Sequence, residues 1–361
     1  MKNIVNLGNV ATYINGYAFK PSDWAEDGTP IIRIQDLTGN SYQMNRFKGI
    51  VDSKYDVNSG DVLISWSASL GVYVWNRGNA VLNQHIFKVV FDKEEVDKDF
   101  FVFQIDNLLK RAANQAHGAT MRHLTKPVFD ALPFYLPDIK TQRLISSKLN
   151  LIVHLIEDHH EQLKKLDELI RSRFIEMFGD LINEPKYPGI KLGSLGIMIT
   201  GGTPSRKHDE YYGGNIPFIS TPCLGSNFIS EKNVQNYLTE AGVKNSATHK
   251  IPPYSLMVGN RVGVGKSSIN TCEMCTNQDI LSFVHIDTSR FDLLFLKKVI
   301  DQYSPYFDEH KRGATIQGVP SKVIKDSMVP DVPLEMQKRY TALVKQSDKS
   351  KMAVQKSLDE L

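Results

Sequence analysis

Two ordered copies of one unit occupy most of this chain. The block Gly118–Met121 returns as Gly313–Ile316, 195 residues later, and Gln142 returns as Gln337 at the same offset. Other blocks repeat in the same order at offsets between 186 and 194: Gly16–Lys20 as Gly202–Arg206, Pro30–Ile34 as Pro217–Thr221, Asp61–Ser65 as Ser255–Gly259, and Asn83–Gln84 as Asn277–Gln278. Ordered matches of this kind indicate a duplicated fold, so we predict two globular parts of about 140 residues, each followed by the same closing element.

The closing element of each copy is predicted to be a long helix with a heptad pattern. Residues 141–178 carry apolar side chains at eight of ten a and d positions and would span roughly 55 Å at about 1.5 Å per residue. A second such helix is predicted over 337–361. The a and d positions are Ile145, Leu149, Ile152, Ile156, His159, Leu163, Leu166, Ile170, Arg173 and Met177, and then Tyr340, Val344, Ser347, Lys351, Val354, Leu358 and Leu361. Because each seam needs a partner, we predict that the two helices form an antiparallel coiled coil. His159 on the seam is expected to be a buried polar pair or a device that fixes the register, rather than a metal ligand.

The composition constrains the number of domains, the cellular compartment and the kind of nucleic-acid binding that the chain can have. Apolar residues make up 41% of the 361 residues, enough for the cores of two or three domains. No N-terminal signal pattern is present and no run approaches about 18 apolar residues, so we expect neither secretion nor a membrane span. Three cysteines suit a reducing compartment, and we expect a cytoplasmic protein. The net charge of +3 predicts that any nucleic-acid binding comes from local clusters of cations.

Each globular part is predicted to mix strands and helices. Short β-rich runs bounded by Gly, Asn and Pro occupy matched places in both halves, and each half then has one helical run, 99–115 or 291–307. The predicted strands are 30–34, 61–65, 80–91, 216–220, 255–258 and 279–286. Pro-rich stretches at 132–138 and 328–333 should be extended. The predicted fold class is α+β (mixed α/β), with globular domains at 1–138 and 181–333 and long helices at 139–180 and 334–361.

Three fragments that look catalytic fail on spacing. Gly263–Ser267 resembles part of a phosphate-binding loop, but Asn260 stands where the first glycine is needed and 269–275 lacks helical character. Ile251–Tyr254 resembles the tetrapeptide of adenine methyltransferases without its leading Asn or Asp. Pro137–Lys140 matches part of a nuclease signature whose second acidic residue and lysine are missing downstream. No catalytic residue is therefore predicted.

A zinc site is equally poorly supported. Cys272 and Cys275 have the spacing of a zinc knuckle, but tetrahedral zinc needs four ligands. Cys223 and scattered histidines are the remaining candidates, and the matching stretch of the first half, 78–82, has no cysteine. No metal is therefore predicted.

Polar, glycine-bearing loops with a few cations recur in both halves and give the better functional signal. Arg and Lys suit phosphates and guanine edges, Asn and Gln suit adenine, and Ser or Thr serves either. A plain surface loop explains any single residue as well, but repetition at matched positions favours a binding surface. The candidates are Lys20, Trp66, Ser67, Ser69, Thr120, Arg122, His123 and Lys126 in the first half, and Thr203, Ser205, Arg206, Lys207, Arg261, Lys266, Arg312, Thr315 and Gln317 in the second.

This arrangement resembles, over essentially the whole chain, the specificity (S) subunit of type I restriction-modification systems, which serve bacterial defence. The resemblance rests on Gly201–Arg206 followed by Gly213–Ile219, then Gly263–Lys266 with Thr276–Gln278, then Gly313–Thr315 leading to Pro333–Gln337. In the first half Gly16–Lys20 replaces the Thr-Pro-Ser-Arg form, as expected where two domains bind different sequences.

The resemblance implies a DNA-binding adaptor without chemistry of its own. Each target-recognition domain would bind one half of an asymmetric, bipartite site in double-stranded DNA, and the helix pair would set their separation. The helices would also dock two methyltransferase subunits, through Ile145, Leu149, Ile152, Ile156, Leu163, Leu166, Ile170, Val344, Val354 and Leu358, and restriction subunits would join. S-adenosylmethionine and ATP would belong to these partners, so no cofactor is expected in this chain. The alternatives are a coiled-coil interaction scaffold that binds no DNA and a stand-alone DNA-binding regulator.

Overall fold

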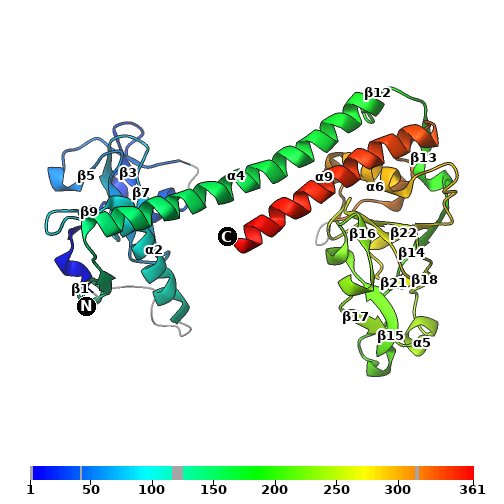
Figure 1. The fold of residues 1–361 in the computed structure, drawn as a ribbon, viewed down its shortest axis with the longest axis horizontal. Coiled ribbons are helices and arrows are strands. Elements are labelled where there is room, and N and C mark those ends of the chain that lie inside the picture. The colour runs from blue at the N-terminus through cyan, green and yellow to red at the C-terminus, as the bar shows by residue number, and fades with distance from the viewer. Residues whose placement is uncertain (1–2, 41–42, 116–124, 314–316) are drawn as a thin grey trace. The chain divides into compact units, whose positions relative to one another are not determined.

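A continuous helix, α4 (Ile139–Phe178), links two compact units of the chain. The computed structural model describes residues 3–40, 43–115, 125–313 and 317–361. The units are Met1–Leu155 and Ile156–Leu361, so their boundary falls inside α4, which Figure 1 shows as one uninterrupted element.

The described residues of the first unit form two four-stranded sheets, one two-stranded pair and a long helix. Its antiparallel sheet has the order β2-β9-β6-β7, and a second sheet has the order β4-β3-β8-β5 with β3 and β8 parallel. The elements are β1 (Ile4–Asn6), β2 (Thr12–Asn15), β3 (Thr29–Ile32), α1 (Ile34–Leu37), β4 (Arg46–Phe47), β5 (Asp56–Val57), β6 (Val62–Ser65), β7 (Gly71–Val74), β8 (Ala80–Leu82), β9 (Ile86–Val90), α2 (Lys98–Gln115), α3 (Lys126–Asp130) and β10 (Pro133–Tyr135). Strand β1 pairs with β10, so the two ends of the globular part are joined just before α4 begins.

The second unit repeats this topology with additions: β16 extends its larger sheet to five strands, and β11 and β12 form an extra pair. Its sheets have the orders β14-β22-β19-β20-β16 and β17-β15-β21-β18, with β15 and β21 parallel, and β13 pairs with β23 as β1 does with β10. The elements are β11 (Gly179–Asp180), β12 (Glu184–Pro185), β13 (Gly189–Lys191), β14 (Ile197–Thr200), β15 (Tyr212–Ile219), β16 (Phe228–Ile229), β17 (Asn236–Leu238), α5 (Glu240–Lys244), β18 (Lys250–Ile251), β19 (Leu256–Gly259), β20 (Ser267–Asn270), β21 (Met274–Thr276), β22 (Ile280–Val284), α6 (Leu293–Gln302), α7 (Ser304–Glu309), α8 (Ser321–Lys325), β23 (Met328–Pro330) and α9 (Leu334–Glu360). The predicted α+β fold and its duplication are confirmed.

The helix predicted over 291–307 is in fact two. It breaks at Tyr303, where α6 ends and α7 begins with Pro305 in its first turn. Proline has no backbone N–H to bond the preceding turn, so the first helix cannot continue through it.

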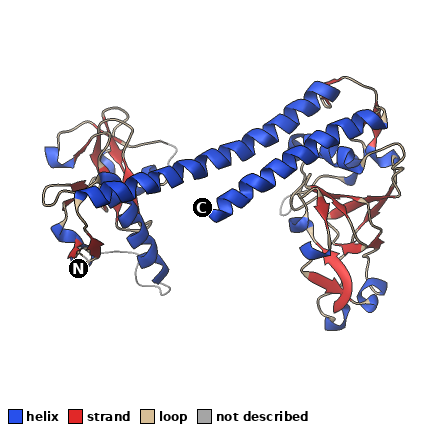
Figure 2. Cartoon of the chain, in the orientation of Figure 1, coloured by secondary structure: helices blue, strands red, loops and turns tan. Residues whose placement is uncertain are grey.

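Aromatic side chains fill the core of the second unit where three helices meet. Phe174 and Phe178 of α4, Phe295 of α6 and Tyr340 of α9 are all fully buried, and their ring centroids lie 5.0–6.4 Å apart. Figure 2 shows these helices along one side of the strands of this unit. The long helices are therefore part of the domain core as well as of the coiled coil.

Within the second unit, α4 and α9 run antiparallel, as predicted (Figure 1). Tyr340 Oη donates to the carbonyl of Ile170 at 3.3 Å, near the start of α9. Towards the end of α9, His159 Nε2 lies 2.9 Å from Ser357 Oγ, so His159 does form a polar pair, although the pair is half-buried rather than buried.

The apolar seam of α4 departs from the heptad near its end. Arg173, expected on the seam, is exposed, and Phe174 is buried in its place. Buried residues at 170, 174 and 178 follow the straight helical repeat of about 3.6 residues, which drifts by about 20° per heptad from a 3.5-residue seam. The drift turns the stripe towards α6, so the end of α4 packs on α6 as well as on α9.

A buried glutamine anchors the first long helix to its globular part. Gln142 is 1% exposed. Its Oε1 accepts the N–H of Asp97 at 2.9 Å, and its Nε2 donates to the carbonyls of Pro137 and Glu95 at 2.8 and 3.3 Å. The side chain thus ties α4 to the segment that enters α2.

Gln337 makes the same contacts in the second copy. Its Oε1 accepts the N–H of Asp292 at 2.9 Å, and its Nε2 donates to the carbonyls of Val332 and Arg290 at 2.9 and 3.0 Å. Every partner lies 195 residues after its counterpart. The repeated glutamine is therefore a structural anchor, which explains why the sequence repeat includes it.

Replacing Gln337 with alanine should destabilise the second unit by about 2–3 kcal/mol, because buried backbone groups would lose their partners. Gln346→Ala is the matched control, since Gln346 is exposed on the same helix. Denaturant unfolding followed by circular dichroism measures both. Equal midpoints for the two variants would contradict the anchoring role.

Candidate nucleic-acid interface

A polar cleft of about 480 Å³ opens in the second unit, where the turn after β19, the start of β22 and the segment before α8 meet. Two arginines, Arg261 and Arg312, and two amide side chains, Asn260 and Gln278, line it. The other lining residues are Thr200, Leu281, Gly318, Val319, Pro320 and Ser321. Cations and amides together suit an anionic ligand with hydrogen-bonding edges, as DNA is.

Arg261 is held from two sides. Its Nη1 lies 3.6 Å from Asp279 Oδ1, and that carboxylate is only 13% exposed. Asp279 is itself fixed, because Asn277 Nδ2 donates to its Oδ2 at 3.2 Å. The stem of Arg261 lies against Gly318, where a Cβ would come within 2.7 Å of Arg261 Cγ. The guanidinium is therefore restricted in orientation although half of the side chain is exposed.

Arg312 is held through its backbone. Its N–H donates to the carbonyl of Gly318 at 2.8 Å, and the N–H of Gly318 donates back at 2.9 Å. The side chain is exposed, and no ion pair involves it among the residues that the structure describes. Arg312 thus offers a positive charge without a fixed direction.

The glycine pair before Thr203 brings that residue to the cleft. A Cβ at Gly201 would lie 2.2 Å from the carbonyl oxygen of Asn277, so any larger residue at this position would clash with the backbone. The N–H of Gly202 donates to the carbonyl of Thr276 at 2.9 Å. The hydroxyl of Thr203 then donates to Oε1 of the cleft residue Gln278.

Other candidates of the second unit are exposed but stand apart from the cleft lining. Ser205, Arg206 and Lys207 form the rest of the Thr203 loop, and Gln317 precedes Gly318. Thr315 lies outside the described residues, as do Thr120, Arg122 and His123 of the first half.

Lys266 lines a different cavity, of about 450 Å³, together with Lys297, Asp301 and Asp348. Arg261 and Lys266 both lie in the turn between β19 and β20, but they line different cavities. In the cavity of Lys266 the ammonium of Lys297 donates to both oxygens of Asp301 at 2.8 and 3.0 Å. Burial nevertheless lowers the pKa of Lys297, since Asp301 offsets only part of the desolvation. The DNA contact predicted for Lys266 would therefore lie in a different cavity from Arg261 and Arg312.

The corresponding surface of the first unit is built around Trp66. Its Nε1 donates to Asn15 Oδ1 at 3.1 Å, and its ring stacks on Phe87 with centroids 5.7 Å apart. His85 lies edge-on at 5.0 Å and has a φ of 73°, a left-handed conformation that histidine seldom adopts. Strained residues of this kind are often found at binding sites.

The remaining candidates of the first unit vary in exposure. Ser67 is 5% exposed, whereas Ser69 and Lys20 are exposed. Lys126 pairs with Asp130 at 2.8 Å and lies 5.7 Å from the ring of Tyr13. Lys126 is thus already engaged within its own unit.

Comparison of the two units shows different chemistry on the same scaffold. At an offset of 194 residues, the positions of Trp66, Ser67, Gln84 and His85 are those of Asn260, Arg261, Gln278 and Asp279. Only the glutamine is shared. Gln278 lies in a repeated block, but the sequence gives no sign that Asn260, Gln278 and Asp279 come together with Arg261.

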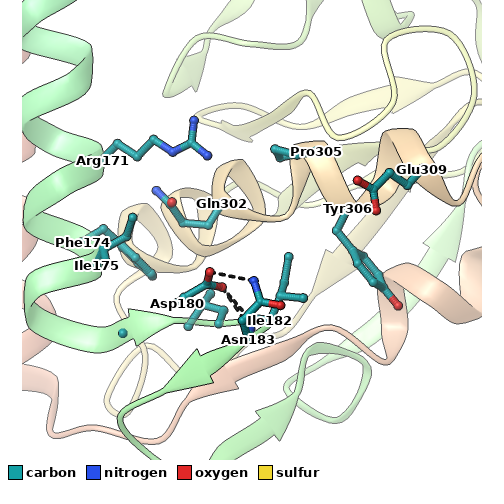
Figure 3. A pocket seen from close by; sticks show the side chains of 12 residues that line it. Arg171, Phe174, Ile175, Asp180, Ile182, Asn183, Gln302, Pro305, Tyr306 and Glu309 are labelled. Atoms are coloured by element: carbon teal, nitrogen blue, oxygen red, sulfur yellow. Dashed lines mark hydrogen bonds between the residues drawn. The ribbon is translucent and has the colours of Figure 1, made fainter.

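A third cavity, of about 320 Å³, lies at the end of α4. Figure 3 shows Arg171 and Gln302 on one side of it and Glu309 and Tyr306 on another. Hydrogen bonds from the side chain of Asn183 and from nearby backbone N–H groups hold the pKa of Asp180 below its usual value. With carboxylates beside its arginine, this cavity lacks the positive bias that DNA binding needs.

Among the described residues, no group of three or more His, Cys, Asp or Glu side chains is arranged to hold a metal. Burial raises the pKa of the Cys275 thiol to about 11, so that thiol stays protonated. Within the same residues, no helix combines the length and apolar character needed to cross a membrane.

Comparison with known proteins identifies the family. The model of the type I restriction modification DNA specificity domain matches twice, over residues 2–168 and 187–360. The chain belongs to this family. The two matches coincide with the two copies of the repeat.

Curated relatives match over part of their length. The specificity subunit of the type I restriction enzyme EcoBI from Escherichia coli is 25% identical over 170 residues, which are 46% of this chain and 35% of that protein. That of HindI from Haemophilus influenzae is 29% identical over 124 residues, 34% of this chain and 27% of that protein. The chain thus aligns with about a third of the length of these relatives.

Solved structures share the fold over the full chain. A chain in a structure that concerns assembly and conformational transition of the type I R-M system has a TM-score of 0.64 and 15% identity, covering 99% of this chain and 94% of that one. The S subunit of a type I restriction-modification system from M. genitalium has a TM-score of 0.56 and 12% identity, covering 100% and 92%.

Proposed function

We propose that this chain is the DNA sequence-specificity subunit of a type I restriction-modification complex and that each globular unit binds one half of an asymmetric, bipartite DNA target. Family membership supports the class of function. The observation that carries the proposal is the contrast between Arg261 and Asp279 in the second unit and Ser67 and His85 at the equivalent positions of the first. Since different donors and acceptors select different base edges, the two half-sites should differ in sequence.

The chemistry would come from partners. Two methyltransferase subunits and restriction subunits would assemble on this chain in the cytoplasm, bringing S-adenosylmethionine and ATP with them, and the chain itself would be non-catalytic. A run of exposed apolar side chains on α4, Leu151–Val153 and Leu155, supports docking of other proteins along this helix, because clustered apolar surface marks contact sites.

Methylome sequencing of the host with and without this chain tests the proposal. We expect one bipartite methylated motif to disappear when the chain is deleted and to return when it is restored. A methylome that does not change would contradict the proposal.

Binding measurements distinguish the two alternatives. A coiled-coil scaffold would show no salt-dependent, sequence-selective binding to duplex DNA, whereas a stand-alone regulator would bind selectively with no effect on methylation. A specificity subunit should do both: select a duplex sequence and direct methylation to it.

A further inference from the structure

Arg261 and Arg312 line the same cleft of the second unit but differ in what surrounds them. Arg261 faces the carboxylate of Asp279 at 3.6 Å and rests on Gly318. Arg312 has an exposed side chain and, in the part of the chain that the structure describes, no acidic partner. The guanidinium of Arg261 is therefore oriented and its charge partly neutralised, whereas the guanidinium of Arg312 is neither oriented nor neutralised.

The two kinds of DNA contact place different demands on an arginine. A phosphate contact needs positive charge and tolerates many orientations, whereas a guanine contact needs the planar guanidinium aligned with O6 and N7 of one base. The carboxylate of Asp279 weakens the general attraction of Arg261 for phosphates but limits its orientation. At 3.6 Å the pair is longer than a hydrogen bond, so the N–H donors of Arg261 remain available to a ligand.

We infer that Arg261 recognises a guanine in the half-site of the second unit, that Asp279 is the positioning residue for it, and that Arg312 binds a backbone phosphate. This inference rests on the proposed function and names residues and a base within it. Because the first unit has Ser67 and His85 at the corresponding positions, its half-site has no arginine contact from this place in the fold.

The test uses the full chain with its methyltransferase partners and a set of duplexes in which each base pair of the target is changed in turn. Arg261→Lys keeps the charge but loses the two-pronged contact, so discrimination at one position of the second half-site should fall about tenfold or more. Asp279→Asn should relax the same position. Combined with Arg261→Lys it should add nothing, because Asp279 acts through that arginine.

Arg312→Ala should behave differently. Affinity for all duplexes should fall alike, and the slope of log affinity against log salt should decrease by about 1. Arg290→Ala is the matched control, since Arg290 is an exposed arginine paired with Asp331 at 3.0 Å and does not line the cleft. It should leave both discrimination and salt slope unchanged.

Three outcomes would overturn the inference while leaving the proposed function intact. They are full discrimination by Arg261→Lys at every position, a uniform loss of affinity in that variant, and a further loss of discrimination when Asp279→Asn is added to it. If the wild-type complex showed no sequence preference at all, the proposed function would fail first.

Discussion

Replacing Phe174 with alanine should destabilise the second unit by about 3–5 kcal/mol, the cost of removing a fully buried aromatic ring. The ring lies 5.0 Å from that of Phe178, 5.4 Å from Tyr340 and 6.2 Å from Phe295, measured between centroids. Since these neighbours come from α4, α9 and α6, the cavity would loosen all three helices at their common junction. Denaturant unfolding gives the change in stability, and hydrogen exchange should show faster opening of α6 and α9.

The next residue along α4 provides the control. Ile175 is 43% exposed, so Ile175→Ala should change the free energy of unfolding by no more than about 0.5 kcal/mol. A heptad seam through Arg173 and Met177 would not predict this contrast. Similar losses for both variants would show that α4 does not pack through Phe174.

The duplicated architecture could be predicted from the sequence because it leaves local signals. Blocks such as Asp61–Ser65 and Ser255–Gly259 are whole strands at matched positions, now seen as β6 and β19. The heptad pattern is likewise local to each helix. The parallel pairing of β3 with β8 and of β15 with β21 could not be predicted, because it joins segments about 50 residues apart that carry no common motif.

The candidate site was harder to predict than the fold. Arg261 and Lys266 lie in one short turn, and their sequence spacing gives no sign that they line different cavities. The role of Asp279 was also hidden, because an acidic residue in a strand-rich segment is usually a solvated surface group. Its proximity to Arg261 depends on the pairing of β19 with β22, which is a tertiary contact. Charged residues that are close in sequence can therefore be assigned to separate sites only once the fold is known.

Exchanging residues 1–135 for the corresponding part of a relative should replace one half of the DNA target and leave the other half unchanged. The structure favours an exchange boundary after residue 135 for two reasons. Strands β1 and β10 would be exchanged together, so their pairing stays within the donor sequence. Gln142 would remain in the recipient, and it bonds only backbone groups of Asp97 and Glu95 on the exchanged side, so these bonds do not depend on which side chains the donor has at those two positions.

The methylated motif of the hybrid, sequenced in cells that supply the methyltransferase partners, measures the result. A reciprocal exchange of 181–333 should alter the other half-site, since the second unit has its own sheets and its own glutamine anchor, Gln337. A hybrid that methylates a target changed in both halves would show that the two units do not recognise DNA independently. An active hybrid with an unchanged motif would show that the first unit does not determine a half-site, because the exchanged part includes Trp66, Ser67 and His85, where the second unit has other residues.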